Sequence, residues 1–289
     1  MPERLKKPEW LKIRLSDSIR YAQTQQVIES HCLNTICVSG RCPNQSECWS
    51  RGTATFMIQG DICTRNCRFC HTKTGKPEPL DVKEPQIVAD SIKLMHLRHV
   101  VITSVTRDDL PDLGAAHWAE TILAVRRTNP GTTIEVLIPD FQGRRMLIKE
   151  VIEAAPDIIS HNMETVRRLT PEVRSAATYE RSLAVLQQVA ASGIIAKSGL
   201  MAGLGESETE VLETMDDLRK AGCTMLTLGQ YLQPSRRQTE VKEYVSPEQF
   251  ARYKIIALEK NFTHVESGPL VRSSYYADRQ SSCLKNKSC

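Results

Sequence analysis

Residues 53–70, with the sequence TATFMIQGDICTRNCRFC, decide how the fold of this chain is predicted. The first six residues are apolar or β-branched, which indicates a buried strand. A Gly-Asp pair then opens a loop that carries three cysteines in a C-x3-C-x2-C spacing: Cys63, Cys67 and Cys70. The stretch therefore predicts three thiolates just beyond the carboxyl end of a strand, the edge where parallel α/β folds place their chemistry.

Three thiolates on one short loop suit a [4Fe–4S] cluster better than zinc. Structural zinc takes four protein ligands, and a cubane normally takes four cysteines, so three leave one iron open to a small molecule. With Phe69 before the last cysteine, the spacing resembles that of the radical S-adenosylmethionine (SAM) superfamily. The resemblance implies that SAM chelates the open iron and is cleaved to a 5′-deoxyadenosyl radical. The alternative is a zinc knuckle or a few buried thiols.

Composition limits the class of protein. The chain has 289 residues, of which 40% are apolar and 25% charged, and this suits one large α/β domain or two small ones. A net charge of only +4 and an aromatic content of 5% argue against nucleic acid. No apolar run approaches the ~20 residues of a membrane helix, and the start lacks the apolar segment of a secretory signal. We therefore expect a cytoplasmic protein whose clustered cysteines bind metal rather than form disulfides.

A second cysteine group comes before the first strand, in a C-x4-C-x5-C spacing: Cys37, Cys42 and Cys48. Gly40 and Pro43 make this stretch rich in loop signals, which would let the sulfurs converge. Cys32 is a possible fourth ligand, but it falls in a predicted helix over 19–33. One such triplet is weak evidence, whereas two within 34 residues favour two clusters.

After the first strand, apolar strands alternate with helices, which predicts βαβ units and a parallel sheet. The expected strands are 99–105, 132–138, 157–160, 194–201, 224–229 and 263–266. The expected helices are 85–97, 114–128, 144–154, 178–191, 206–221 and 246–260. We expect an α/β fold, a partial (β/α)6 TIM-type barrel with N- and C-terminal extensions. The expected units are an N-terminal extension over 1–52 with the second cysteine group, a barrel over 53–266 and a C-terminal extension over 267–289.

Polar residues follow several predicted strands, as a barrel enzyme requires. An asparagine and a glutamate on one loop can hydrogen-bond a ribose and an amino-acid head group, and a cation can meet a carboxylate. Each residue alone could equally be a cap or a dipole partner. The candidate cofactor-binding residues are Phe69, Ser104, Asn162, Glu164, Arg174 and Lys197. The Gly-rich run 201–206 lacks the G-x-G-x-x-G spacing and predicts a turn.

Near the C-terminus, an Arg-Ser-Ser-Tyr run occupies residues 272–275. The Cys37 group lacks a fourth ligand, and a serine oxygen is able to supply one. An oxygen is a poor ligand for iron beside thiolates, so such a bond would be labile. The sequence does not separate the two adjacent hydroxyl groups. Cys223 is expected to be a small buried residue, and Cys283 and Cys289 are expected to be unliganded.

Together these features resemble the lipoyl synthase family over nearly the whole chain. The matching stretches are KPEWLK at 7–12, both cysteine groups, TSVTRDDLPDLGA from 103, HNMETVRRLTPEVR from 161, KSGLMAGLGE from 197 and SGPLVRSSY from 267. Two cysteine triplets combined with RSSY make a highly specific set.

The resemblance implies that the cluster of Cys63, Cys67 and Cys70 generates the radical. That radical removes hydrogen from C6 and C8 of an octanoyl chain on a lipoyl carrier domain or a glycine-cleavage H protein. A second [4Fe–4S] cluster, held by Cys37, Cys42, Cys48 and Ser274, with Ser273 as the alternative, supplies both sulfurs and is consumed. The resemblance also implies an electron donor such as flavodoxin or ferredoxin, an iron–sulfur carrier that rebuilds the cluster, and a monomer.

The sequence departs from the family pattern at four positions: Thr106 for an acidic residue, Leu113 for glycine, and Gln238 and Tyr276 for histidines. These departures concern the rate or the carrier preference rather than the cluster chemistry. The alternatives are a sulfur-inserting enzyme similar to biotin synthase or a methylthiotransferase, an iron–sulfur electron carrier, or a zinc scaffold. A simple carrier needs no barrel of this length.

Overall fold

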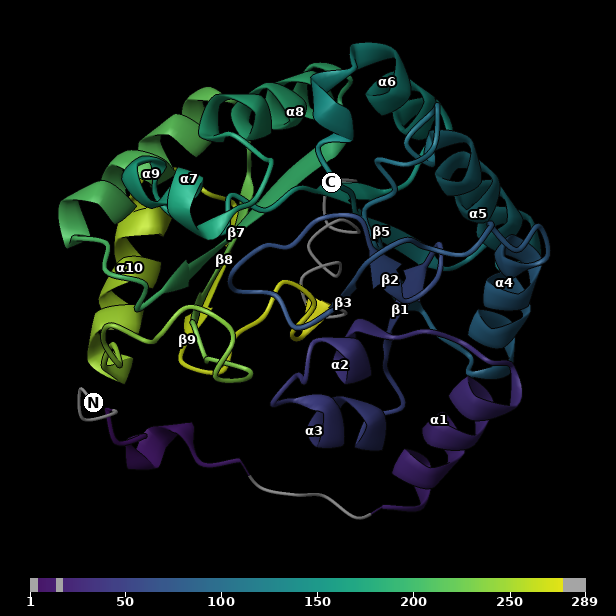
Figure 1. Ribbon diagram of the computed structural model, residues 1–289, viewed down its shortest axis with the longest axis horizontal. Coiled ribbons are helices and arrows are strands. Elements are labelled where there is room, and N and C mark those ends of the chain that lie inside the picture. Colours follow the sequence, from purple (N-terminus) through teal and green to yellow (C-terminus); the bar gives the residue numbers. More distant parts are fainter. Residues whose placement is uncertain (1–4, 14–17, 278–289) are drawn as a thin grey trace, which may run out of the picture.

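Seven parallel strands form a curved wall in the computed structural model, which describes residues 5–13 and 18–277 (Figure 1). Their order in the sheet is also their order in the chain. The strands are β1 (Thr55–Ile58), β4 (His99–Ser104), β5 (Thr133–Leu137), β6 (Ile158–Ser160), β7 (Ile195–Ala202), β8 (Met225–Gln230) and β9 (His264–Gly268). A second, two-stranded sheet pairs β2 (Ile62–Cys63) with β3 (Lys73–Thr74).

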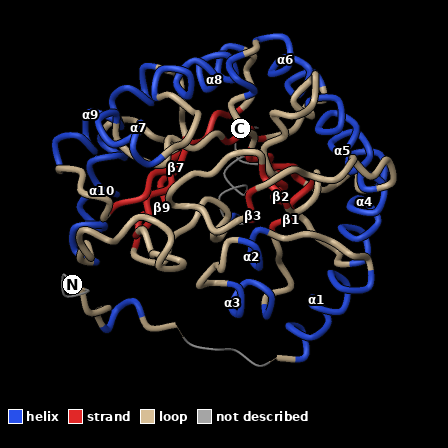
Figure 2. The backbone as a smooth tube through the Cα atoms, in the orientation of Figure 1, coloured by secondary structure: helices blue, strands red, loops and turns tan. Residues whose placement is uncertain are grey.

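A long helix follows each of the first six strands of the wall, and these helices cover its outer side (Figure 2). They are α4 (Glu84–Leu94), α5 (Ala115–Thr128), α6 (Arg145–Glu153), α8 (Tyr179–Ala191), α9 (Glu208–Lys220) and α10 (Pro247–Glu259). Short helices lie in the connections: η2 (Phe141–Gly143), η3 (Arg167–Leu169) and α7 (Thr170–Val173). Because helices cover the outer face of the sheet and side chains fill its inner face, the strands are largely buried, and all four residues of β1 are buried.

The structure confirms the predicted partial (β/α)6 barrel, with β9 as a seventh strand. Every predicted strand and helix of the barrel lies within three residues of its expected bounds. The predicted turn at 201–206 is also found, because Gly203 has a φ of 98° and a Cβ there would collide with the Gln230 side chain. β9 continues to Gly268, two residues past the expected end of the barrel. The division of the chain into three units stays a prediction.

Two predictions about the N-terminal extension were wrong. The first helix, α1 (Ile19–Ser30), ends before Cys32, which is exposed and has a φ of 50°, so this thiol is not part of a helix. The stretch around the Cys37 group is not mainly loop, because it folds into α2 (Ile36–Ser39) and α3 (Gln45–Ser50). The Thr35 side chain caps α2 by accepting from the Val38 amide.

The extensions meet at the open side of the barrel. Thr35 pairs with Phe56 of β1 in an antiparallel bridge, which places α1, α2 and α3 beside the first strand (Figure 1). The N-terminal segment, which contains η1 (Glu9–Leu11), packs through Leu11, whose side chain is fully buried. After β9, residues 269–277 turn back toward the N-terminal helices, and Asn44 Nδ2 donates to the Leu270 carbonyl at 2.6 Å. We call residues 269–277 the C-terminal segment.

The remaining predictions concern Cys223, the two C-terminal cysteines and membrane-spanning helices. Cys223 is fully buried, and its thiol lies 3.3 Å from the carbonyl oxygens of Ala196 and Met225, so the prediction of a small buried residue is confirmed. Cys283 and Cys289 lie outside the described residues. Within the described part of the chain, every helix is too short or too polar to traverse a bilayer.

Candidate active site

The loop of Cys63, Cys67 and Cys70 is fixed by charged residues at the strand ends. Arg65 forms a two-pronged ion pair with Asp108, at 2.7 and 2.9 Å, and also reaches Asp140 at 2.7 Å. The Cys63 sulfur accepts the backbone amides of Arg65 and Thr106, each at 3.4 Å. Amide donors of this kind stabilise a sulfur that carries negative charge, as a cluster ligand does.

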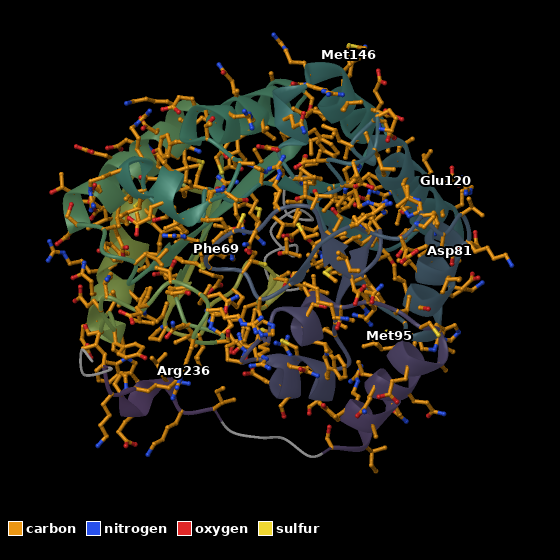
Figure 3. The ribbon with its side chains drawn as sticks, viewed as in Figure 1. Phe69, Asp81, Met95, Glu120, Met146 and Arg236 are labelled. Atoms are coloured by element: carbon orange, nitrogen blue, oxygen red, sulfur yellow. The ribbon has the colours of Figure 1, made fainter. Side chains whose placement is uncertain are left out.

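The same loop is held on its other side by the connection between β8 and α10. The Thr239 amide donates to the Arg68 carbonyl at 2.9 Å, and Gln238 Nε2 donates to the Cys70 carbonyl at 3.1 Å. Gln238, one of the four departures from the family pattern, therefore contacts the backbone of a proposed cluster ligand. Phe69 packs against the main hydrophobic core, and Figure 3 shows it inside the ring of helices.

Asn162 and Glu164 come together in a pocket inside the barrel. Asn162 Nδ2 donates to Glu164 Oε1 at 3.1 Å and to Ser273 Oγ at 2.8 Å. The other residues that line this pocket are Gly199, Leu200, Met201, Thr227, Gly229, Val271 and Arg272. Burial raises the pKa of Glu164, against the opposing charge of Arg174. We call this the barrel pocket.

The remaining candidate cofactor-binding residues lie in different surroundings. Arg174 donates to Ser182 Oγ at 2.7 Å and to the Met163 carbonyl at 3.3 Å, next to the pocket residues Asn162 and Glu164. Ser104 Oγ is buried and has no hydrogen-bond partner among the described residues. Lys197 is bound instead to Glu135 and to the Ser273 carbonyl, at 2.7 and 2.8 Å.

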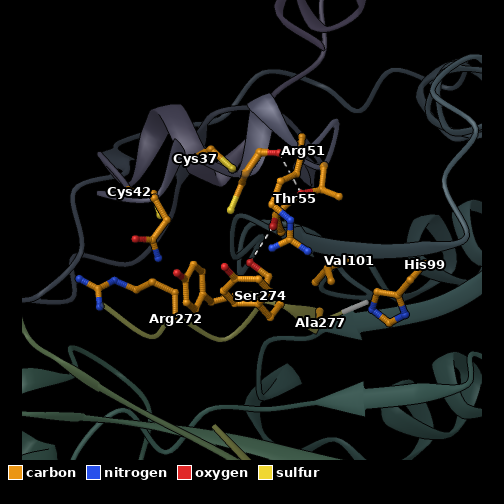
Figure 4. A pocket seen from close by; sticks show the side chains of 15 residues that line it. Cys37, Cys42, Arg51, Thr55, His99, Val101, Arg272, Ser274 and Ala277 are labelled. Carbon is orange, nitrogen blue, oxygen red and sulfur yellow. Dashed lines mark hydrogen bonds between the residues drawn. The ribbon is translucent and has the colours of Figure 1, made fainter. Parts of the chain in front are cut away.

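Cys37, Cys42 and Cys48 line a second, open pocket with about 550 Å³ of empty space, which we call the cysteine pocket. Cys37 projects from α2 on one side, and Ser274 of the C-terminal segment faces it from the other (Figure 4). Burial and the neighbouring Cys42 raise the pKa of Cys37 to about 11, while burial and the other two thiols raise that of Cys48 to about 12. The free thiols are therefore protonated at neutral pH, and a metal must displace those protons to bind.

The donor sets of both sites fit iron–sulfur clusters. Each triplet offers three soft sulfur ligands, the kind that such clusters take, and the cysteine pocket adds the Ser274 hydroxyl. Among the described residues, no three or more His, Cys, Asp or Glu side chains are arranged to hold a single metal ion. Each triplet thus offers three of the four protein ligands that a cluster normally takes, which leaves one place for a non-cysteine ligand.

The two sites lie close together rather than on opposite faces of the molecule. Arg272 lines both the cysteine pocket and the barrel pocket. The loops also touch, because His71 Nδ1, in the residue after Cys70, lies 3.1 Å from the carbonyl of Ser39, the last residue of α2. Two clusters that serve one reaction need this proximity, because the substrate carbon must reach both.

The sequence analysis missed several residues of these sites. Thr55, His99 and Arg272 line the cysteine pocket, and Arg65 anchors the loop of Cys63, Cys67 and Cys70. Arg272 is the first residue of the RSSY run, so its place beside the candidate serine ligand could have identified it. Thr55 and His99 gave none, because each begins a strand whose residues predict only burial.

Comparison with known proteins extends this picture. The model of the Radical SAM superfamily matches residues 57–218. A lipoyl synthase of Parabacteroides distasonis is 63% identical over 279 residues, which cover 96% of this chain and 99% of that protein. Lipoyl synthases of Bacteroides fragilis and Treponema denticola are 64% and 58% identical, over 96% and 95% of this chain and 96% and 94% of their own lengths.

Solved structures with little sequence identity share the fold. Methylornithine synthase (PylB) matches with a TM-score of 0.55 at 11% identity, over 87% of this chain and 83% of its own. Streptococcus suis SuiB bound to S-adenosylmethionine matches with a TM-score of 0.59 at 9% identity, over 77% of this chain and 54% of its own. The family model and the full-length relatives together show that this chain belongs to the radical SAM superfamily and, within it, to the lipoyl synthase family.

Proposed function

We propose that this chain inserts two sulfur atoms into a carrier-bound octanoyl group and that its two cysteine triplets divide the work. The observation that carries this division is the contact between the two cysteine loops, in which His71, next to Cys70, lies 3.1 Å from the Ser39 carbonyl at the end of α2. When bound, one [4Fe–4S] cluster with SAM supplies a 5′-deoxyadenosyl radical that removes hydrogen from C6 and C8, and a second, sacrificial [4Fe–4S] cluster supplies both sulfurs. Unactivated C–H bonds offer nothing for an acid or base to act on, so the cofactors provide the reactivity and the protein provides position.

In this proposal the radical site consists of Cys63, Cys67 and Cys70 as ligands. Asn162 and Glu164 lie together in the adjoining barrel pocket, where their amide and carboxylate suit the ribose and amino group of SAM. Arg174 is the proposed partner of the SAM carboxylate, because the neighbouring Ser175 hydroxyl lies 3.6 Å from the Cys67 sulfur. The buried, unpartnered Ser104 hydroxyl is a further contact for SAM, and Phe69 shields the loop from water.

In the second site, Cys37, Cys42 and Cys48 are the proposed ligands of the sulfur-donating cluster, and Ser274 is the fourth. Ser274 lines the cysteine pocket with them, whereas Ser273 lines the barrel pocket. A hydroxyl would hold iron less firmly than a thiolate, so Ser274 would be the most easily released of the four ligands. Arg272 adds a positive charge beside Cys42, which favours the anionic cluster.

The proposed substrate is an octanoyl chain on a lipoyl carrier domain or on a glycine-cleavage H protein. An electron donor such as flavodoxin or ferredoxin, an iron–sulfur carrier that rebuilds the cluster, a monomeric state and a cytoplasmic location complete the proposal. They rest on the family and on the use of reduced, clustered cysteines. No nucleic acid or membrane has a part in it.

The deciding experiment is mass spectrometry of an octanoylated carrier peptide after anaerobic, reductive incubation with SAM. The proposal expects a gain of two sulfurs per octanoyl chain and about eight irons per chain before the reaction, from two cubanes. The Cys42→Ala variant is the matched control, and it should yield no sulfur-containing product. Zinc without sulfide in the purified protein, or an unmodified peptide with fully loaded enzyme, would contradict the proposal.

A further inference from the structure

A buried ion pair crosses the interior of the barrel. Lys197 of β7 and Glu135 of β5 are joined at 2.7 Å, and each side chain is only 1% exposed. Removing two charges from water costs several kcal/mol per ion, and a well-packed apolar pair often replaces such a bridge without loss of stability. A contribution to stability therefore does not explain why this buried ion pair is present. The other contacts of Lys197 and Glu135 indicate its role.

One oxygen of the Glu135 carboxylate is fixed by two hydrogen bonds, and the other lies near His99 without a hydrogen bond. Lys197 Nζ and Ser160 Oγ donate to Oε1 at 2.7 and 3.2 Å, and His99 Nε2 lies 3.3 Å from Oε2. Burial alone would raise the pKa of Glu135, but the charge of Lys197 and the contact with His99 hold it at about 2. The Lys197 ammonium is thus held in one place by an anchored anion.

That ammonium reaches beyond the sheet to the C-terminal segment. Lys197 Nζ donates to the Ser273 carbonyl at 2.8 Å. Because the Ser273 carbonyl and the Ser274 amide belong to the same planar peptide unit, fixing this oxygen also fixes the direction in which the chain enters Ser274. From that unit, the Ser274 hydroxyl lies in the cysteine pocket, 2.7 Å from Thr55 Oγ1.

We propose that Lys197, held by Glu135, is a positioning residue that keeps Ser274 directed at the Cys37, Cys42 and Cys48 triplet. This replaces the role of cofactor-binding residue that the sequence favoured for Lys197, and it rests on the proposed function of Ser274. The ion pair links the sheet to the C-terminal segment, which carries the proposed ligand Ser274. We call this link the strut. A strut on strands gives a more accurate placement than a loop contact.

The test uses the double variant Glu135→Gln/Lys197→Met, which removes both charges and leaves no unpaired ion in the core. The first measurement is hydrogen exchange of the metal-free protein, which does not depend on activity. The amides of Tyr275 and Ala277 donate to the Arg272 and Ser274 carbonyls, so their exchange reports on this turn. Loss of one hydrogen bond to a charged group should make them exchange about tenfold faster.

The second measurement separates the two reactions of the loaded enzyme. The double variant should form 5′-deoxyadenosine within about twofold of the parent rate but make roughly tenfold less lipoyl product, since only the serine ligand is displaced. The control Arg126→Met/Asp157→Asn removes an ion pair of 2.8 Å that does not touch the C-terminal segment. It should leave both the turn's exchange and the product ratio unchanged.

Three outcomes would overturn the inference. Unchanged exchange at Tyr275 and Ala277 would show that the strut does not hold the turn. A parallel loss of SAM binding and 5′-deoxyadenosine would return Lys197 to the cofactor site. Should the double variant not fold, Glu135→Met/Lys197→Met also leaves no unpaired ion in the core, and exchange equal to the parent's would again reject the strut. Failure of the proposed function is distinguishable, because then the unaltered enzyme adds no sulfur.

Discussion

Ser273 and Ser274 are neighbours in the chain, yet their hydroxyl groups lie in different pockets. Ser273 Oγ accepts from Asn162 at 2.8 Å in the barrel pocket, whereas Ser274 Oγ accepts from Thr55 at 2.7 Å in the cysteine pocket. The C-terminal segment therefore contributes one serine to the barrel pocket, where SAM is proposed to bind, and one to the cysteine pocket, where the sulfur-donating cluster is proposed to bind. This placement supports Ser274 as the fourth ligand of the sulfur-donating cluster.

The serine pair gives a matched comparison. Ser274→Ala should lower the iron and sulfide bound at the Cys37 triplet and reduce lipoyl product by at least about tenfold, because a ligand is lost. Ser273→Ala removes only a hydrogen bond to Asn162 and should cost about 1 kcal/mol or less. Iron and sulfide counts beside product yields check both. Equal effects of the two substitutions would contradict the assignment.

The cysteine triplets should fail in different ways. Cys67→Ala is expected to abolish 5′-deoxyadenosine, since the site that binds SAM loses a ligand. Cys42→Ala should still cleave SAM but insert no sulfur, because the donor cluster alone is lost. Chromatography of 5′-deoxyadenosine and mass spectrometry of the carrier peptide distinguish the two. Lipoyl product from Cys42→Ala would rule out that triplet as the sulfur source.

His161 predicts a loss of stability in mild acid. Burial, with the charge of Arg174, lowers its pKa from 6.5 to about 4, and its ring lies 2.9 Å from the Ile138 carbonyl and 3.0 Å from Ser182 Oγ. Above pH 6.5 the His161 side chain is neutral in both the folded and the unfolded protein. As pH falls from 6.5 to 4, the unfolded chain takes up a proton that the folded one refuses, which removes about 3 kcal/mol of stability.

Urea unfolding of the metal-free protein between pH 7 and pH 4 measures this effect. His161→Asn should be less stable at pH 7, because it loses a hydrogen bond, but its stability should depend less on pH. His96→Asn, a substitution on the exposed surface, is the control and should keep the slope of the parent. An unaltered slope in His161→Asn would show that another group causes the acid sensitivity.

Leu113 occupies a position where the family usually has glycine, and its φ of 54° is in the left-handed region. That conformation costs a side-chain residue about 1–2 kcal/mol. The leucine is only 3% exposed and belongs to the main core, so its removal should cost about 2–5 kcal/mol. Leu113→Gly should therefore lower the free energy of unfolding in urea, and a gain would mean that backbone strain outweighs packing.

Local sequence determined most of the architecture. The alternation of β-branched strands with helices of 10 to 15 residues predicted the partial barrel, since each element's apolar pattern reports its own burial. The two cysteine spacings and the RSSY run likewise predicted the ligand sets, because residue type and spacing decide which metal groups can bind. The short helices α2 and α3 escaped prediction, because Gly40 and Pro43, which do lie in the connection between them, were taken as signals for the whole stretch.

Only the tertiary structure decided how the pieces meet. Adjacent serines are indistinguishable in sequence, and their hydroxyls part because the C-terminal segment runs between the sheet and the N-terminal helices. Lys197 looked available for a ligand until Glu135, 62 residues away in the chain, was found beside it. Contacts between distant residues depend on how strands and extensions pack together, which no local pattern of residues records.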